Sequence, residues 1–301
     1  MNWRRMLCVV TCVASMSTMV SGLSRAETLG LVYEGADVLP AVVVDGQPLL
    51  LHTQGLYVTE RHYLVTGRRE SIPRRAYLLR FDRMTGDVEH VDITPAKDQG
   101  ETLDHPGGMD VDDTGDVWIP LSTSHRRGPS RICRYRVDPE RPLAELTMVS
   151  SFEVDDHIGA VCCLSQQQLL GANWDSLELT VWQRDGQHVS RAKQAAFIAG
   201  GSGRIAVQDW KRWRDETVAN ADWVLLGGLD KAATPATSVV QLVEIANRQG
   251  RVVAAQTLLP RDDTARPVTN EGMAVYDGRV YLLPEDVGRG AKVLRYRIER
   301  N

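Results

Sequence analysis

The chain has 301 residues, a formal net charge of −4 and 25% charged residues. That length suffices for one large β domain with an ample core. The mildly acidic balance, without a stripe of basic residues, argues against nucleic acid or an anionic membrane as a partner.

The first residues have the organisation of a signal peptide. Arg4 and Arg5 precede a mostly apolar stretch over residues 6–20, and small residues before and at Ala26 offer a cleavage site. The apolar stretch is shorter than the roughly 20 residues that span a bilayer. We therefore expect a cleaved signal peptide over 1–26, a single domain over 27–301, and a secreted protein, periplasmic or extracellular, without a membrane span. Cleavage would remove three arginines and no acid, so the net charge would change from −4 to −7.

A short pattern returns about every 50 residues, a spacing typical of the blades of a β-propeller. Each copy has a polar residue, a glycine, alternating apolar residues, a turn and a second apolar strand. The copies begin at His52, His105, His157 and Asn270, and a degenerate copy begins at Gly203. The repeat predicts an all-β fold with one propeller domain.

The strands can be placed in chain order. The first unit has four apolar runs at 56–58, 62–66, 77–82 and 88–93, which amount to one blade. Similar units follow over 108–154, 157–182, 205–258 and 273–298. The last unit lacks a fourth strand, which residues 29–33 could supply by closing the ring. We expect five blades, or six if residues 41–51 form a reduced blade. The best helix candidate is 209–219, although its Trp-Lys-Arg-Trp run also suits the extension of a strand.

Three cysteines remain after signal cleavage. Cys162 and Cys163 are adjacent in a predicted strand, so their side chains point to opposite faces. We expect three buried thiols; one disulfide to Cys133 is the alternative.

The propeller geometry brings polar residues from several blades to one mouth. Residues just before each inner strand and just after each second strand converge there. They are imidazoles, carboxylates and amides, which suit metal binding or acid–base work. The set is His52, Gln54, Asp104, His105, Ser122, Asp156, His157, Asn173, Asp175, Asn270, Glu271, Glu285 and Asp286.

Two interpretations of the histidines are open. His52, His105 and His157 could together bind a divalent metal such as Zn, Mn, Fe or Ca and leave an open position. Asp104 and Asp156 would then orient the imidazoles beside them. Alternatively, each histidine hydrogen-bonds loop backbone and fixes a corner between blades.

Other residues at the mouth are candidates for catalysis or ligand binding. Glu271 and Asp175 are the catalytic candidates. Trp174 lies between two polar residues, where an aromatic ring could stack on a sugar or another flat ligand. The ligand-binding candidates are Asn173, Trp174, Asn270 and Glu285.

Several motifs resemble those of a bacterial family of secreted β-propeller proteins of unknown function. They are His105-Pro-Gly-Gly108-Met-Asp, Val117-Trp-Ile-Pro120, Arg134-Tyr-Arg-Val-Asp138-Pro139, Asp155-Asp156-His157-Ile-Gly159 and Ala172-Asn-Trp174-Asp-Ser. The sequence departs from the family pattern at Asp175, where a glycine is usual, and at Trp210, where a cysteine is frequent. The resemblance implies a propeller fold and a location outside the cytoplasm. Because the family has no settled activity, the resemblance does not identify catalytic residues.

These observations favour a secreted propeller that binds a small polar ligand such as a carbohydrate, and a divalent metal as well if the histidines converge. A metal-dependent hydrolase or lyase acting on a lactone, phosphoester or sugar acid is the second hypothesis. A non-catalytic interaction scaffold is the third. The fold alone does not choose among them, because propellers serve all three purposes.

Overall fold

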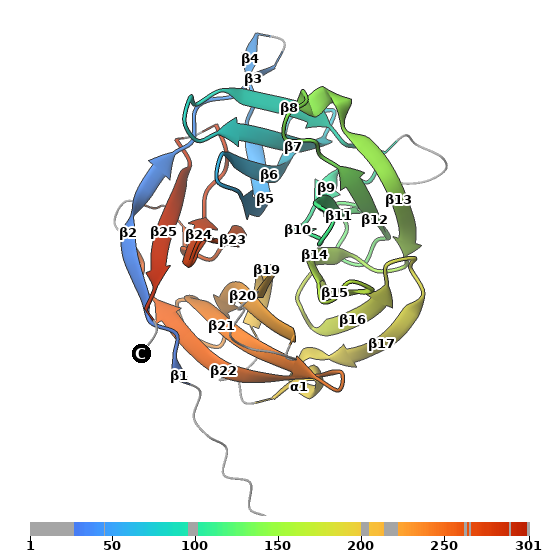
Figure 1. The fold of residues 1–301 in the computed structure, drawn as a ribbon. Coiled ribbons are helices and arrows are strands. Elements are labelled where there is room, and N and C mark those ends of the chain that lie inside the picture. The colour runs from blue at the N-terminus through green and yellow to red at the C-terminus, as the bar shows by residue number, and fades with distance from the viewer. Residues whose placement is uncertain are drawn as a thin grey trace, which may run out of the picture.

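The computed structural model describes residues 27–44, 46–95, 102–199, 205–213, 222–261, 264, 266–288 and 290–299. The predicted signal peptide lies outside the described residues. Five small antiparallel sheets stand around one axis as the blades of a propeller (Figure 1). The five-blade prediction is therefore confirmed.

The blades follow one another along the chain. Blade 1 consists of β5 (Leu51–Val58), β6 (His62–Arg69), β7 (Arg75–Asp82) and β8 (Val88–Asp92). Blade 2 consists of β9 (His105–Pro106), β10 (Asp110–Val111), β11 (Asp116–Ser122), β12 (Ser130–Arg136) and β13 (Thr147–Val154). Blade 3 consists of β14 (Ile158–Cys163), β15 (Gln168–Asn173), β16 (Glu178–Gln183) and β17 (His188–Lys193).

The last two blades include the N-terminal strands. Blade 4 consists of β19 (Ile205–Trp213), β20 (Asp222–Asp230), β21 (Thr237–Ala246) and β22 (Gln249–Leu258), with β1 (Glu27–Thr28) and β18 (Ile198–Ala199) paired in parallel to β22. Blade 5 consists of β23 (Gly272–Tyr276), β24 (Arg279–Leu283), β25 (Lys292–Ile298) and β2 (Leu31–Val38). Because β2 pairs with β25 from Leu31 opposite Ile298 onward, the N-terminal segment closes the ring as predicted.

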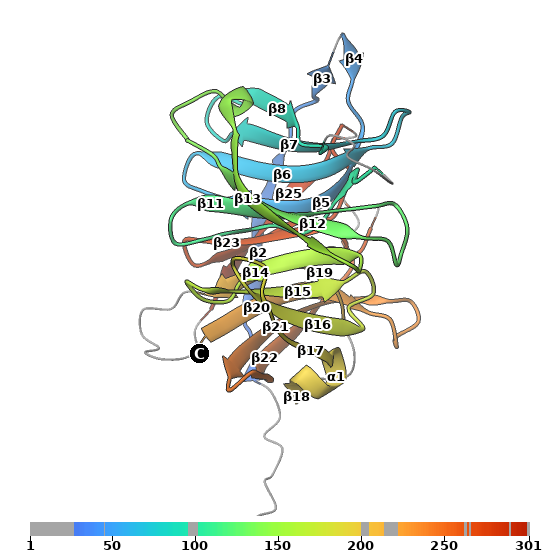
Figure 2. The ribbon, with the colours of Figure 1, turned by 90° about the vertical axis from the view of Figure 1, so that its right-hand side faces the viewer.

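The structure excludes the six-blade alternative and the helix candidate over 209–219, and it confirms the alternative of a strand through the Trp-Lys-Arg-Trp run. Residues 41–51 do not form a sixth blade: they hold a two-stranded hairpin, β3 (Val43–Val44) with β4 (Gln47–Pro48), that projects from the ring (Figure 2). The predicted helix over 209–219 is a strand as far as Trp213, and its remainder lies outside the described residues. Within this strand the side chains of Asp209 and Lys211 are buried against each other.

Little of the described chain is helical. Helix α1 (Gln194–Phe197) and a 3₁₀ turn at Leu143–Glu145 are the helices among the described residues. Neither is long and apolar enough to cross a membrane.

The apolar core is divided into five clusters, each between two neighbouring blades. One joins blades 1 and 5 through residues such as Leu79 and Val293, and another joins blades 2 and 3 through Trp118 and Val161. The three cysteines are buried thiols outside any disulfide, as predicted. Burial raises the pKa of Cys133 to about 11, so this thiol is unreactive at neutral pH.

The inner strands approach closely because glycine stands where they meet. The Gly108 amide donates to the Gly159 carbonyl at 2.8 Å, and the Val161 amide donates back to the Gly108 carbonyl at 3.0 Å. A Cβ at Gly108 would lie 2.6 Å from a carboxylate oxygen of Asp209 and 3.0 Å from the Cβ of Ala160. Because Gly108 has no side chain, the inner strands of three blades can pack against one another at this point.

We expect Gly108→Ala to destabilise the fold by about 1–3 kcal/mol, because overpacking forces neighbouring backbone to move. Gly159→Ala is the matched control, since its Cβ would find only ordinary contacts at 3.6 Å and beyond. Urea unfolding followed by tryptophan fluorescence measures both. Equal stabilities of the two variants would show that the inner strands are not packed this tightly.

Candidate functional site

Residues that begin the inner strands gather on one face, here called the mouth. The structure brings the three predicted histidines side by side there. The ring centroids of His52 and His105 are 6.3 Å apart, and those of His105 and His157 are 5.2 Å apart. Blades 1, 2 and 3 supply one imidazole each.

Two of these imidazoles are neutral, and each has a fixed tautomer. The Arg68 guanidinium lies 3.2 Å from Nδ1 of His105 and can only donate, so Nδ1 accepts and the ring proton lies on Nε2. Nδ1 of His157 lies 2.9 Å from the His125 carbonyl oxygen, which can only accept, so Nδ1 carries the proton and Nε2 keeps its lone pair. Burial, with the positive charge of Arg68 nearby, lowers the pKa of His157 to about 4 and that of His105 well below its usual range.

His52 has a different environment, because it faces two carboxylates of blade 5. Its Nδ1 is 3.0 Å from Oδ1 of Asp286 and 4.0 Å from Oε1 of Glu271. Asp286 follows β24, whereas Glu271 directly precedes β23. Residues 234 positions apart in the sequence thus meet because the ring closes between blades 5 and 1.

Arg266 bridges the two carboxylates. Its guanidinium donates to Glu271 at 2.9 Å and to both oxygens of Asp286 at 3.1 and 2.9 Å. The amide of Asn270 also donates to Glu271, at 2.6 Å. The cluster therefore holds two acids, one guanidinium and one imidazole in direct contact.

The two carboxyl groups differ in burial, and their pKa values move apart. Glu271 is only 4% exposed. Burial raises its pKa to about 7, in spite of the opposing charges of His52 and Arg266. Burial also acts on Asp286, but the hydrogen bond and charge of His52 and the charge of Arg266 outweigh it and lower the pKa. Near neutral pH, Glu271 is thus poised to hold a proton while Asp286 is ionised.

Burial lowers the pKa of His52, but the hydrogen bond to Asp286 and the charges of Glu271 and Asp286 outweigh it, so the net shift is upward. His52 is thus the one mouth histidine whose surroundings favour the protonated ring.

The group whose ligand atoms converge differs from the predicted three histidines. Among the described residues, His52, Glu271 and Asp286 place ligand atoms within 4.8 Å of one another. His105 and His157 stand next to this group but direct one nitrogen each to Arg68 and to a backbone carbonyl. Asp104 and Asp156 do not orient the imidazoles as expected: Asp104 accepts from Ser124, and Asp156 accepts the His157 backbone amide.

The other predicted residues lie at the mouth with varied surroundings. Trp174 is 38% exposed, and its ring lies 5.1 Å from that of His105 and 4.4 Å from that of His157. Asp175 forms an ion pair with Arg126. The amide group of Asn173 is engaged with Asp156 and with the backbone of Glu178. Glu285 is partly exposed beside Asp286.

Sequence reasoning missed the two arginines. Arg68 lies in β6 and Arg266 in the loop before β23, and neither belongs to a repeat motif. Their roles depend on how a loop and a strand end face a neighbouring blade, which no local pattern reveals.

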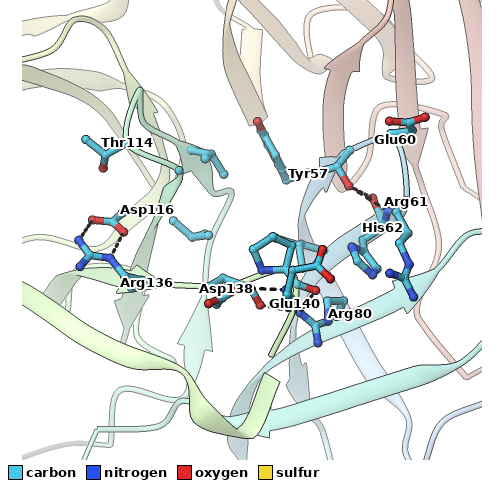
Figure 3. A pocket seen from close by; sticks show the side chains of 17 residues that line it. Tyr57, Glu60, Arg61, His62, Arg80, Thr114, Asp116, Arg136, Asp138 and Glu140 are labelled. Atoms are coloured by element: carbon cyan, nitrogen blue, oxygen red, sulfur yellow. Dashed lines mark hydrogen bonds and ion pairs between the residues drawn. The ribbon is translucent and has the colours of Figure 1, made fainter. Parts of the chain in front are cut away.

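A hollow of about 520 Å³ lies between blades 1 and 2 on the face opposite to the mouth (Figure 3). Its rim includes Arg136, paired with Asp116 at 3.0 Å, and Arg80, which donates to Glu89 at 2.6 Å. None of the predicted site residues lines this hollow.

No protein-family model matches the sequence, and comparison with curated proteins gives no match. The resemblance to a family of secreted propellers therefore stays a prediction. Among solved structures, the chain is similar to a GH43 β-xylosidase/α-arabinofuranosidase from a compost microbial metagenome in complex with xylotriose, with a TM-score of 0.53, 10% identity, and coverage of 90% of this chain and 96% of that one.

Two further solved propellers are less similar. An exo-1,5-α-L-arabinanase from a bovine ruminal metagenomic library has a TM-score of 0.48 and 11% identity over 84% of this chain and 97% of that one. A calcium-binding protein, regucalcin, from Agrobacterium tumefaciens has a TM-score of 0.44 and 10% identity over 91% and 97%. At these identities the comparisons show the fold alone.

The raised pKa of Glu271 predicts a pH-dependent stability. Between its usual pKa of 4.5 and about 7, the folded protein holds a proton that the unfolded chain has lost, so stability falls as pH rises through this window. The total fall from this group is about 3 kcal/mol at 1.36 kcal/mol per pKa unit. Glu271→Gln should remove most of it.

Chemical denaturation of both proteins from pH 5 to 8 measures this difference. Glu153→Gln, on the outer strand β13 with its side chain 61% exposed, is the matched control and should keep the wild-type profile. A Glu271→Gln profile parallel to that of the wild type would contradict the raised pKa.

Proposed function

We propose that the mouth binds a small polar ligand and acts on it by acid–base chemistry, with Glu271 as proton donor and the Asp286–His52 pair as proton acceptor. The observation that carries the proposal is geometric: Arg266 donates hydrogen bonds to one buried and one half-buried carboxylate, Glu271 and Asp286. His52 lies 3.0 Å from the Asp286 carboxylate and 4.0 Å from that of Glu271. Two acids of different burial, kept close together, are an arrangement that can divide the roles of acid and base in a hydrolysis. The opposite directions of their pKa shifts support these roles.

In a hydrolysis, His52 with its ring neutral would remove a proton from the attacking water through Nε2. Asp286 would stabilise the resulting imidazolium, the form of the ring that the surroundings of His52 favour. The hydroxide would bond to the electrophilic atom of the ligand. The bond to the leaving oxygen would break, and Glu271 would give that oxygen its proton. One water is consumed, and the proton held by His52 returns to Glu271 through solvent.

Arg266 adds a positioning role. It holds both carboxylates in place and keeps Asp286 ionised, because its guanidinium stays charged at every accessible pH. Among the described residues, no hydrogen bond engages Nε2 of His52, and its side chain is 28% exposed, so this nitrogen can meet a ligand or water.

We expect Glu271→Gln and Asp286→Asn each to lower kcat/KM by about 100-fold or more, the usual size of an acid–base contribution. The measurement is hydrolysis of chromogenic esters, lactones, phosphoesters and glycosides, with Glu153→Gln as control. Wild-type kcat/KM should fall above a pH of about 7, where Glu271 loses its proton, and should fall again at lower pH, where His52 becomes protonated.

Unchanged turnover in both variants would overturn these roles. If the wild type turns over no substrate class, the acid–base proposal fails and a binding protein remains.

A second candidate function is metal binding by His52, Glu271 and Asp286, whose ligand atoms converge. One imidazole and two carboxylates suit Mn, Zn or Ca. However, Arg266 already donates to both carboxylates, so a metal ion would have to displace its guanidinium. We therefore favour the metal-free acid–base site.

If the acid–base site works without a metal, elemental mass spectrometry of the untagged protein should find substoichiometric metal. Addition of Mn, Zn or Ca should not raise its melting temperature. Arg266→Gln should open the cluster and give a metal-dependent increase in melting temperature. Near-stoichiometric metal in the wild type that is lost in Asp286→Asn would favour the metal centre instead.

The cellular location of the protein is a further proposal. From the signal-like residues 1–26, we propose that the protein works outside the cytoplasm. Cleavage at Ala26, read by N-terminal sequencing of the protein from a periplasmic extract or the culture medium, tests it.

A further inference from the structure

Beside the carboxylates, the mouth has an aromatic platform with no role in the acid–base chemistry. Trp174 is 38% exposed, an unusual state for so large an apolar side chain at a polar mouth. Its ring meets those of His105 and His157 at 77° and 74°. Both imidazoles are buried, and they contact the indole from blades 2 and 3.

The backbone around Trp174 is also fixed. Its amide donates to the His157 carbonyl at 2.9 Å, and the Ser176 amide donates to the Asn173 carbonyl at 2.7 Å. The Ser176 hydroxyl accepts the Val207 amide of blade 4 at 2.9 Å. Because the turn is anchored on both sides, a ligand stacking on the indole would lose little conformational entropy of the protein.

The two imidazoles in edge contact with the indole have complementary hydrogen-bonding capacity. The tautomers fixed above give His105 an Nε2–H donor and His157 an Nε2 acceptor. A hydroxyl group both donates and accepts, so it satisfies this pair, whereas a carboxylate or phosphate offers only acceptors. A metal ion would need two lone pairs and finds one, and the Arg68 cation 3.2 Å from His105 would repel it.

We propose that Trp174, His105 and His157 form a subsite for a neutral sugar ring, which stacks on the indole and places a hydroxyl group against the two imidazoles. The inference rests on the proposed function in that it names the ligand class of the same mouth. His105 lies between Trp174 and His52, with centroid distances of 5.1 and 6.3 Å. A ring held on Trp174 would therefore direct its neighbouring substituent toward Glu271 and Asp286.

Binding and turnover can be tested separately in the Glu271→Gln protein. Saturation-transfer NMR and calorimetry would use methyl glycosides of xylose, glucose, galactose and mannose, with glucuronate as the anionic probe and cyclohexanol as the apolar probe. We expect at least one neutral glycoside to bind, and to bind more tightly than glucuronate and cyclohexanol.

Trp174→Ala should then weaken binding about tenfold or more, and Trp174→Phe should retain most of it because an aromatic face remains. His188→Ala, on the outer strand β17, is the control variant. Circular dichroism melting verifies that each variant is folded. The subsite proposal fails if no glycoside binds the folded protein, if glucuronate or cyclohexanol binds best, or if Trp174→Ala binds equally well.

A second readout tests the recognition chemistry without a ligand. Long-range ¹H–¹⁵N spectra at neutral pH should show His105 protonated on Nε2 alone and His157 on Nδ1 alone. A protonated ring or the opposite tautomer at either position would overturn the hydroxyl-binding role. Loss of turnover in Glu271→Gln with glycoside binding intact would support the acid–base proposal, so the two proposals can fail independently.

Discussion

One buried carboxylate holds the centre of this propeller together. Asp209 of blade 4 accepts the backbone amides of Leu56 in blade 1 at 3.3 Å and of Met273 in blade 5 at 3.0 Å. Its partner Lys211 is 2.6 Å away and also donates to the Met109 carbonyl of blade 2, at 2.5 Å. A single ion pair thus links four of the five inner strands. Removing either partner would leave an uncompensated charge in the interior, which is far more costly than losing an exposed ion pair.

The arrangement of the mouth depends on this centre. His52 and His105 lie at the beginnings of β5 and β9, and Glu271 directly precedes β23, so fixing these inner strands at Asp209 and Gly108 also fixes the three side chains. Rigid support of this kind matters for acid–base chemistry, which requires reacting groups to be placed before the ligand arrives. The mouth then divides into two parts, a charged cluster between blades 5 and 1 and a neutral aromatic platform over blades 2 and 3.

The repeated sequence pattern was enough to predict the blades, the closing N-terminal strand and the proximity of the three histidines, because these features follow from strand order alone. The strand over Ile205–Trp213 was harder to recognise. The buried side chains of Asp209 and Lys211 form an ion pair, so their charges neutralise each other. The sequence shows two charged residues but does not show that they pair.

The partners of the histidines were beyond sequence reasoning for a related reason. Asp286 was only one of thirteen polar residues expected at the mouth, and its preference for His52 over other imidazoles arises where the two ends of the ring meet. Arg68 adds to the burial that keeps His105 and His157 neutral. Arg266 adds to the effect of His52 that keeps Asp286 ionised. Long flexible side chains on a loop and a strand end have no periodicity to mark them.

The most direct test of the account is the ionisation of Glu271 itself. With ¹³C label on the glutamate side-chain carboxyls, an NMR titration should show one carboxyl with a pKa of about 7 that is missing from Glu271→Gln. Such a group would establish the unequal sharing of protons on which the proposed chemistry depends. If every glutamate instead titrates near its ordinary value, Glu271 is ionised at neutral pH, and the mouth has no proton donor of the kind proposed.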